Sequence, residues 1–336
     1  MRNTEYAKVI AAAGIYAAFA VYLYQPYFRN FGPLHYLHIV NVCLASAGCY
    51  VLSRRWVAAH AASFFAGAIY GFGPFMFGLA RYHPTAGFLT ASIPWLFCPA
   101  ALGPKCRWRW ISWPLATLPF LAIVSFFQVS CRYRLFAVPI RTKLHLADLA
   151  GLLAPLVMAG RNTTLVGFYH VPIAALIVGF AMLLAARRLN ILVIFALGAT
   201  LAFCDPVFSV SPIIWLSIPV LCCAVLIGAG IQGLTSAGYA DRKWVLLAAM
   251  IMAALAIVTL LLATKYFQVF AGLGAKYAKL LVETAKMHIL GSVAAIIIFF
   301  LARAKLRVAA LRWILLSAAM AVDILLGAVF IVDRIF

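Results

Sequence analysis

The chain has 336 residues, of which 67% are apolar and only 10% are charged, and its mean hydropathy is +1.06. Soluble domains keep about a quarter of their residues charged, so this composition excludes a soluble globular protein and predicts an integral membrane protein. The formal net charge is +20, but the Lys and Arg residues lie mainly between apolar runs. The expected partners are therefore anionic lipid headgroups and not nucleic acid.

Apolar runs long enough to cross a membrane fill most of the sequence. A transmembrane helix needs about 20 apolar residues. The runs are continuously apolar and lack the alternation of outer-membrane strands, so we expect an all-α polytopic bundle that forms one membrane domain, residues 1–336, without a soluble domain. The predicted spans, eleven in number, are 9–27, 35–52, 56–79, 85–103, 111–130, 165–186, 189–207, 212–231, 244–264, 287–302 and 313–332.

Two long connections modify this topology. Residues 144–159 form a mostly apolar stretch that is short for a span, so it is expected to be an interfacial helix, a re-entrant segment or a buried twelfth helix. A twelfth span in this stretch would reverse the predicted membrane orientation of the first five spans. In the second connection, Lys276, Lys279, Glu283 and Lys286 recur at steps of three and four, which predicts an amphipathic interfacial helix near 274–287 that leads into the tenth span.

The short loops set the expected orientation. Basic pairs such as Arg54 with Arg55 and Arg187 with Arg188 fall in loops on the same side as the N-terminus. Cytoplasmic loops carry the excess of Lys and Arg. We therefore predict a multi-pass protein of the cell membrane with its N-terminus in the cytoplasm and its C-terminus outside.

The third predicted span combines close packing with a helix break. Ala59, Ser63, Gly67 and Gly71 follow one another at steps of four, a stripe of small residues that lets another helix approach closely. Gly71, Gly73 and Pro74 then weaken the second half of the same run. Broken helices in transporters expose backbone groups to a substrate or an ion, so this break is a candidate gate, and a packed proline kink is the alternative.

Ionisable side chains inside apolar runs are the strongest functional signal, because a charge at the bilayer centre costs at least about 2.5 kcal/mol. Asp323 lies eleventh in the run 313–332, near the expected midplane. His145 and Asp148 share a helical face at a spacing of three, which suits a proton relay or a local hydrogen bond. Asp205 precedes Pro206 and suits a capping role, and His170 lies in the first turns of its span.

No pattern predicts a catalytic centre, a metal site or a cofactor. The seven acidic residues are scattered singly, so no carboxylate cluster for Mg²⁺ exists in the sequence. The cysteines show no paired metal spacing. The glycines of 228–233 match a dinucleotide-binding pattern in letters only, because they end an apolar run and follow no β-strand.

Three functional hypotheses follow, in order of preference. The first is a permease for a small solute, with Asp323, Asp148, His145, Asp205 and His170 as candidate pathway or relay residues. The second is a scaffold or anchor subunit that associates with other membrane proteins. The third is an intramembrane enzyme that acts on a lipid, which would need polar side chains that converge at one depth.

Overall fold

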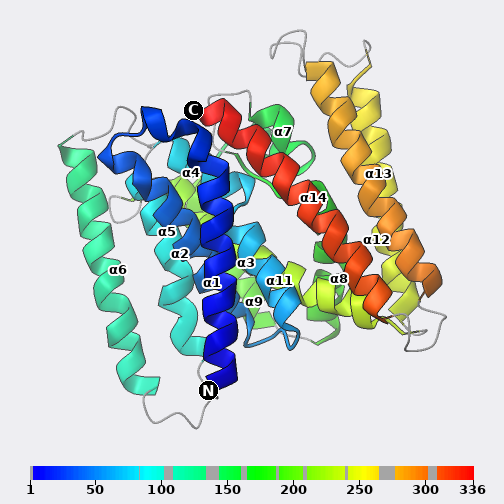
Figure 1. Ribbon diagram of the computed structural model, residues 1–336, viewed down its shortest axis with the longest axis horizontal. Helices are drawn as coiled ribbons and strands as arrows, with labels where there is room; N and C mark the ends of the chain where they lie inside the picture. The colour runs from blue at the N-terminus through cyan, green and yellow to red at the C-terminus, as the bar shows by residue number, and fades with distance from the viewer. Residues whose placement is uncertain are drawn as a thin grey trace.

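Long apolar helices make up most of the computed structural model (Figure 1). The structure describes residues 3–82, 84–101, 109–133, 144–159, 165–186, 189–206, 210–238, 241–264, 277–301 and 309–336. Within these ranges there is no β-strand, so the predicted all-α membrane bundle is confirmed. Eight helical segments are long and apolar enough to cross a membrane, namely Tyr6–Asn30, Tyr36–Ser53, His60–Leu79, Trp110–Arg132, Pro212–Ser236, Arg242–Leu262, Tyr277–Leu301 and Ala310–Ile335.

The helices follow one another in a simple order along the chain. The principal ones are α1 (Asn3–Tyr24), α2 (Tyr36–Ser53), α3 (His60–Gly71), α4 (Pro74–Tyr82), α5 (Pro84–Phe97), α6 (Arg109–Arg132), α8 (His170–Ala185), α9 (Leu189–Phe203), α11 (Ser217–Ser236), α12 (Arg242–Leu262), α13 (Tyr277–Leu301) and α14 (Ala309–Ile335). The short elements are the 3₁₀ helices η1 (Gln25–Asn30), η2 (Pro33–His35), η3 (Cys98–Ala101) and η4 (Leu146–Leu152), and the one-turn helices α7 (Pro155–Met158) and α10 (Pro212–Trp215).

Three of the predicted spans contain helices shorter than expected. The predicted span 85–103 contains α5, which has 14 residues. The spans 165–186 and 189–207 contain α8 with 16 residues and α9 with 15 residues, respectively. Residues 165–169 are apolar but not helical, and α8 begins only at His170. Hydropathy alone does not distinguish a buried non-helical segment from a helix. Because these three helices are shorter than a usual span, the structure does not confirm the predicted number of eleven spans.

Residues 144–159 do not form one helix. The 3₁₀ helix η4 ends at Leu152, and α7 starts at Pro155 and lasts a single turn. This interruption excludes a continuous twelfth helix in the stretch, and residues 154–159 are buried in the bundle. The chain crosses itself closely here, because a Cβ at Gly151 would lie 3.2 Å from the Val166 carbonyl carbon, and Gly167 has a φ of 155° that favours glycine.

The segment predicted as an amphipathic interfacial helix is the beginning of α13. From Tyr277 the helix runs without interruption to Leu301, and residues 274–276 lie outside the described residues. Lys286 Nζ lies 2.8 Å from Glu283 Oε1 on its exposed face. The tenth span therefore starts ten residues earlier than its hydropathy indicates.

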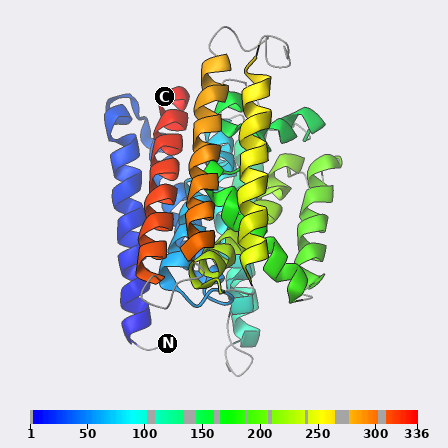
Figure 2. The ribbon, with the colours of Figure 1, turned by 90° about the vertical axis from the view of Figure 1, so that its right-hand side faces the viewer.

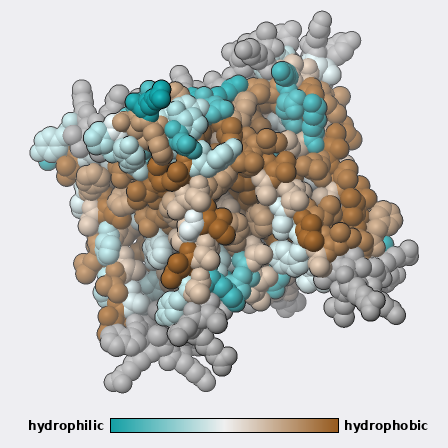
Figure 3. Space-filling model, in the orientation of Figure 1, coloured by the Kyte–Doolittle hydropathy of each residue, from teal (hydrophilic) through white to brown (hydrophobic). Residues whose placement is uncertain are grey.

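The packed helices form a bundle with an apolar waist. The N- and C-termini lie at opposite ends, and α14 crosses the face of the bundle between α1 and α13 (Figures 1 and 2). Hydrophobic side chains cover the middle of this face, with hydrophilic patches toward its upper and lower margins (Figure 3). This distribution fits a protein whose middle lies in lipid.

Small residues bring two helix pairs together. Gly71 and Gly67 of α3 face α2, where a Cβ at Gly71 would lie 2.7 Å from the Val42 carbonyl oxygen. Gly230 of α11 faces Gly179 of α8, with a Cβ at Gly230 only 2.9 Å from the Gly179 nitrogen. The glycines of 228–233 therefore serve helix packing, as expected for small residues at membrane helix interfaces.

Candidate functional site

Asp323 lies in the middle of the last helix. It comes 14 residues after the start of α14 and 12 before its end, which corresponds to about 21 Å and about 18 Å of helix. Its side chain is only 2% exposed. Because an ionised carboxylate at this depth needs partners, the groups around it define a candidate functional site.

Two groups at the start of α8 bind the Asp323 carboxylate. His170 Nδ1 lies 3.0 Å from Asp323 Oδ1, and the Val171 backbone N–H donates to Asp323 Oδ2 at 2.6 Å. The positive end of the α8 dipole points at the same carboxylate. The sequence placed His170 and Asp323 in separate spans, and the structure brings them together, so Asp323 also caps the first turn of α8.

A second buried histidine completes the cluster. His288 lies 11 residues after the start of α13 and 13 before its end, again near the middle of a long helix. Its ring contacts the ring of His170 edge to face, with 4.9 Å between centroids. His288 Nε2 donates to the Leu153 carbonyl oxygen at 3.0 Å, because a carbonyl oxygen only accepts hydrogen bonds. This contact connects the stretch 144–159 to the cluster.

Sequence reasoning missed His288 for an identifiable reason. The predicted span began at Met287, which placed His288 at the membrane surface. Since α13 actually begins at Tyr277, the same residue lies deep in the bundle. The helical pattern of charges in 276–286 already indicated a helix that continues into the span, and adding its length would have moved His288 toward the midplane.

Three polar atoms of this cluster have no hydrogen-bond partner within the described part of the chain. They are His170 Nε2, His288 Nδ1 and Thr284 Oγ1, and all three side chains are fully buried. Thr284 and His288 are four residues apart on α13, so they lie on one face of the helix. Buried polar atoms are normally hydrogen-bonded, which makes this group a place where a proton, a water or a polar solute atom would be stabilised.

The net charge of the cluster also favours the binding of a proton. Asp323 as a carboxylate, with His170 and His288 neutral, gives these three side chains together one net negative charge. One added proton on either free imidazole nitrogen makes the cluster neutral, and the interior of a membrane protein favours the neutral state. The geometry therefore suits a group that binds a single proton.

The predicted helix break is part of the same site. Helix α3 ends at Gly71 and α4 starts at Pro74, so Phe72 and Gly73 interrupt the helix as the sequence indicated. The Phe72 carbonyl oxygen accepts a hydrogen bond from Tyr169 Oη at 2.6 Å, and Tyr169 directly precedes His170. Tyr169 packs on Gly327 of α14, one turn after Asp323. One side chain thus connects the broken helix, the start of α8 and the helix that carries Asp323.

The remaining candidate residues lie outside this cluster. The Asp148 carboxylate accepts a hydrogen bond from the His145 backbone N–H at 2.9 Å, a local contact, while the His145 ring is exposed. Asp205 is exposed just beyond the end of α9. In the stripe of small residues at 59, 63, 67 and 71, Ser63 is fully buried, and Ala59 lies immediately before the first turn of α3. Within the described ranges, no three His, Cys, Asp or Glu side chains come together in a way that could hold a metal ion.

Comparison with protein-family models, with curated proteins and with solved structures finds no match, so the function of the cluster has to be inferred from its geometry.

Proposed function

We propose that this protein is a proton-coupled permease for a small solute, in which Asp323, His170 and His288 bind the coupling proton. The observation that carries the proposal is the buried cluster itself, with its 3.0 Å contact between Asp323 and His170 and its unpartnered imidazole nitrogens. Ionisable groups at this depth in membrane helices mark ion and proton pathways.

The proton would be held at defined atoms. His170 Nδ1 faces the Asp323 carboxylate, and His288 Nε2 donates to the Leu153 carbonyl, so the nitrogens that accept the proton are His170 Nε2 and His288 Nδ1. Protonation at His170 Nε2 creates an ion pair with Asp323. Loss of that proton returns one net charge to the cluster, and this difference would favour different arrangements of the surrounding helices in the two states.

Discontinuous helices supply the elements that could move. The break between α3 and α4 and the late start of α8 meet at the Tyr169 to Phe72 hydrogen bond. Transporters bind substrates and coupling ions at such breaks, near the bilayer midplane. We propose that this hydrogen bond couples the proton site to the break, with the protein in a cell membrane, its N-terminus in the cytoplasm and its C-terminus outside.

Reconstituted vesicles test this proposal. The protein is inserted into liposomes with a trapped pH-sensitive dye, and an inward proton gradient is imposed in the presence of a panel of radiolabelled amino acids, sugars and nucleosides. We expect proton entry to increase in the presence of one class of solute. In Asp323→Asn, the proton flux and the solute flux should both decrease by about tenfold or more, and a tenfold change corresponds to about 1.4 kcal/mol in free energy.

Asp333→Asn is the matched control, because the exposed Asp333 lies on the same helix but near its end, where it accepts a hydrogen bond from Tyr27. Equal fluxes in Asp323→Asn and Asp333→Asn would contradict the proposal. Absence of any flux, together with other membrane proteins that co-purify in a fixed ratio, would favour the scaffold hypothesis instead.

An intramembrane enzyme that acts on a lipid is the second candidate, because Thr284 and His288 place a hydroxyl and an imidazole on one buried helical face. Thr284→Val separates the two functions. A nucleophilic threonine would be lost with this change, whereas proton binding by the histidines and Asp323 would persist.

A further inference from the structure

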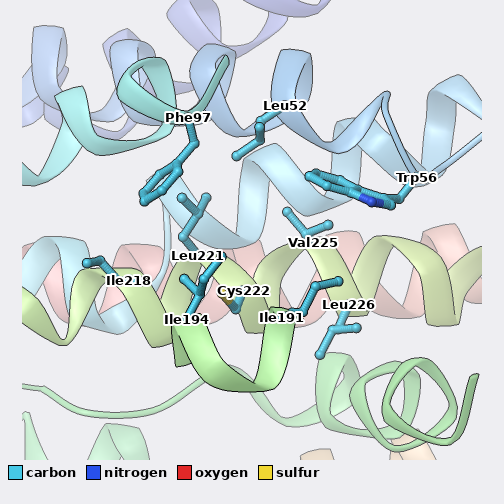
Figure 4. A pocket seen from close by; sticks show the side chains of 10 residues that line it. All are labelled: Leu52, Trp56, Phe97, Ile191, Ile194, Ile218, Leu221, Cys222, Val225 and Leu226. Atoms are coloured by element: carbon cyan, nitrogen blue, oxygen red, sulfur yellow. The ribbon is translucent and has the colours of Figure 1, made fainter. Parts of the chain in front are cut away.

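An apolar cleft of about 150 Å³ lies away from the histidine cluster, between α11, α9 and the end of α2 (Figure 4). Helix α11 contributes a stripe of residues at steps of three and four, which are Ile218, Leu221, Cys222, Val225 and Leu226. Ile191 and Ile194 of α9 lie beside this stripe, and Leu52, Trp56 and Phe97 face it from the other side. A space of this size with an apolar lining stays free of water and accepts hydrocarbon.

The cleft is elongated along α11. From Ile218 to Leu226 the helix advances by eight residues, or about 12 Å. One leaflet of the hydrocarbon core is about 15 Å deep, half of the bilayer value. The length and direction of the cleft therefore match a single acyl chain that enters from one side of the membrane.

One end of the cleft lies beside the turn between α2 and α3. Trp56 lines that end and belongs to the turn between α2 and α3, where the chain leaves the apolar region. The backbone N–H of Ala58, in the same turn, donates to Gln232 Oε1 at 2.8 Å, which fixes the turn against α11 six residues beyond Leu226. Trp56 is 37% exposed, and tryptophan is enriched at the level of lipid headgroups, so we expect this end of the cleft to lie near the membrane surface.

A basic residue adjoins Trp56 in the sequence. Arg55 directly precedes Trp56 and is exposed. The neighbouring Arg54 instead donates to the carbonyl oxygens of Val57 and Ala58, so its guanidinium holds the turn in place. The residues that line the cleft include no carboxylate. A phosphate group beside Arg55 would find a complementary charge above an apolar channel.

We propose that the cleft binds one acyl chain of an anionic phospholipid of the surrounding bilayer, with the lipid phosphate at Arg55. A polar solute finds no hydrogen-bonding side chain along the α11 stripe apart from the thiol of Cys222, whereas a hydrocarbon chain needs none. The site is independent of the proton-binding cluster, since none of its lining residues belongs to that cluster.

Native mass spectrometry of the full-length protein tests this proposal. The delipidated protein in detergent is incubated with an equimolar mixture of phosphatidylglycerol and phosphatidylcholine of identical acyl chains. We expect the wild type to retain one phosphatidylglycerol. Arg55→Gln should reduce the preference for phosphatidylglycerol by about fivefold, the effect of one basic residue near a lipid surface, whereas Arg132→Gln at the end of α6 should leave it unchanged.

A second pair of variants tests the acyl chain. Ile194 is 40% exposed at the rim of the cleft, so Ile194→Trp fills the space from outside without disturbing the core. Ile314 on α14 is 67% exposed and lies outside the cleft lining, so Ile314→Trp is its matched control. Ile194→Trp should lose the retained lipid and the rise in melting temperature that added phosphatidylglycerol gives the wild type.

Three results would overturn the proposal. They are a wild type that retains no phospholipid, retention of phosphatidylcholine equal to that of phosphatidylglycerol, and lipid binding by Ile194→Trp equal to that of Ile314→Trp.

Discussion

The contact between Asp323 and His170 gives a coupling energy that a double-mutant cycle can measure. The cycle compares the wild type with Asp323→Asn, His170→Gln and the double variant. Asp323→Asn removes the negative charge and His170→Gln removes the imidazole, so each single change replaces one side of the contact by a neutral amide, and the double change replaces both. The 3.0 Å distance and the 2% exposure of Asp323 place this pair among buried, charge-assisted interactions.

The size of this coupling energy distinguishes an ion pair from an ordinary hydrogen bond. Neutral side-chain hydrogen bonds between membrane helices average about 0.6 kcal/mol, with a maximum near about 1.7 kcal/mol. Hydrogen bonds to charged groups contribute about 1.5 to 3 kcal/mol. We expect a coupling energy of about 2 to 3 kcal/mol, because the Asp323 carboxylate accepts a second bond from the Val171 backbone and is held in place for His170.

The assay is reversible unfolding of the four proteins in mixed micelles by added denaturing detergent. The control cycle uses Tyr27→Phe and Asp333→Asn, an exposed pair with an Oη to Oδ1 distance of 2.5 Å, for which less than about 1 kcal/mol is expected. If the changes at Asp323 and His170 are additive within about 0.5 kcal/mol, the two side chains do not interact and the proposed site is wrong.

Three further changes have defined outcomes in thermal unfolding. A Cβ at Gly230 would meet the backbone of α8, so Gly230→Ala should lower the free energy of unfolding by about 1 to 3 kcal/mol, whereas Gly14→Ala, in open space on α1, should raise it by up to about 1 kcal/mol. Equal effects would refute the packing argument. Tyr169→Phe removes the hydrogen bond at the helix break and should cost about 1 to 3 kcal/mol, while Tyr22→Phe, whose side chain is 60% exposed, should cost nothing measurable. Glu283→Gln breaks an exposed ion pair on α13 and should change stability by less than about 0.5 kcal/mol, so a larger loss would show a role that its surface position does not explain.

The sequence was sufficient for the features that depend on one helix. The composition and the apolar runs predict a helical membrane bundle, and the place of Asp323 in the run 313–332 indicates a deep carboxylate, which the structure finds buried in the middle of α14. The interruption at Gly73 and Pro74 follows from the backbone properties of those residues and requires no knowledge of neighbours.

Features that depend on contacts between distant segments could not be predicted from one sequence. His170 and Asp323 are 153 positions apart, and nothing in the spacing of apolar residues indicates which helices become neighbours. The non-helical stretch 165–169 is as apolar as a helix, so hydropathy placed it within the sixth span. For the same reason, the place of Tyr169 at the break between α3 and α4 emerges only in three dimensions.

The position of the carboxylate on α14 has a consequence for biosynthesis. A ribosome synthesises α14 after α8 and α13, so His170, the Val171 amide and His288 exist before the carboxylate that binds the first two of them. Until Asp323 is synthesised, the start of α8 has no acceptor from this partner, and the nascent bundle is incomplete at its centre. A chain truncated before Asp323 would therefore insert most of its helices and still present quality-control proteases with an unsatisfied interior.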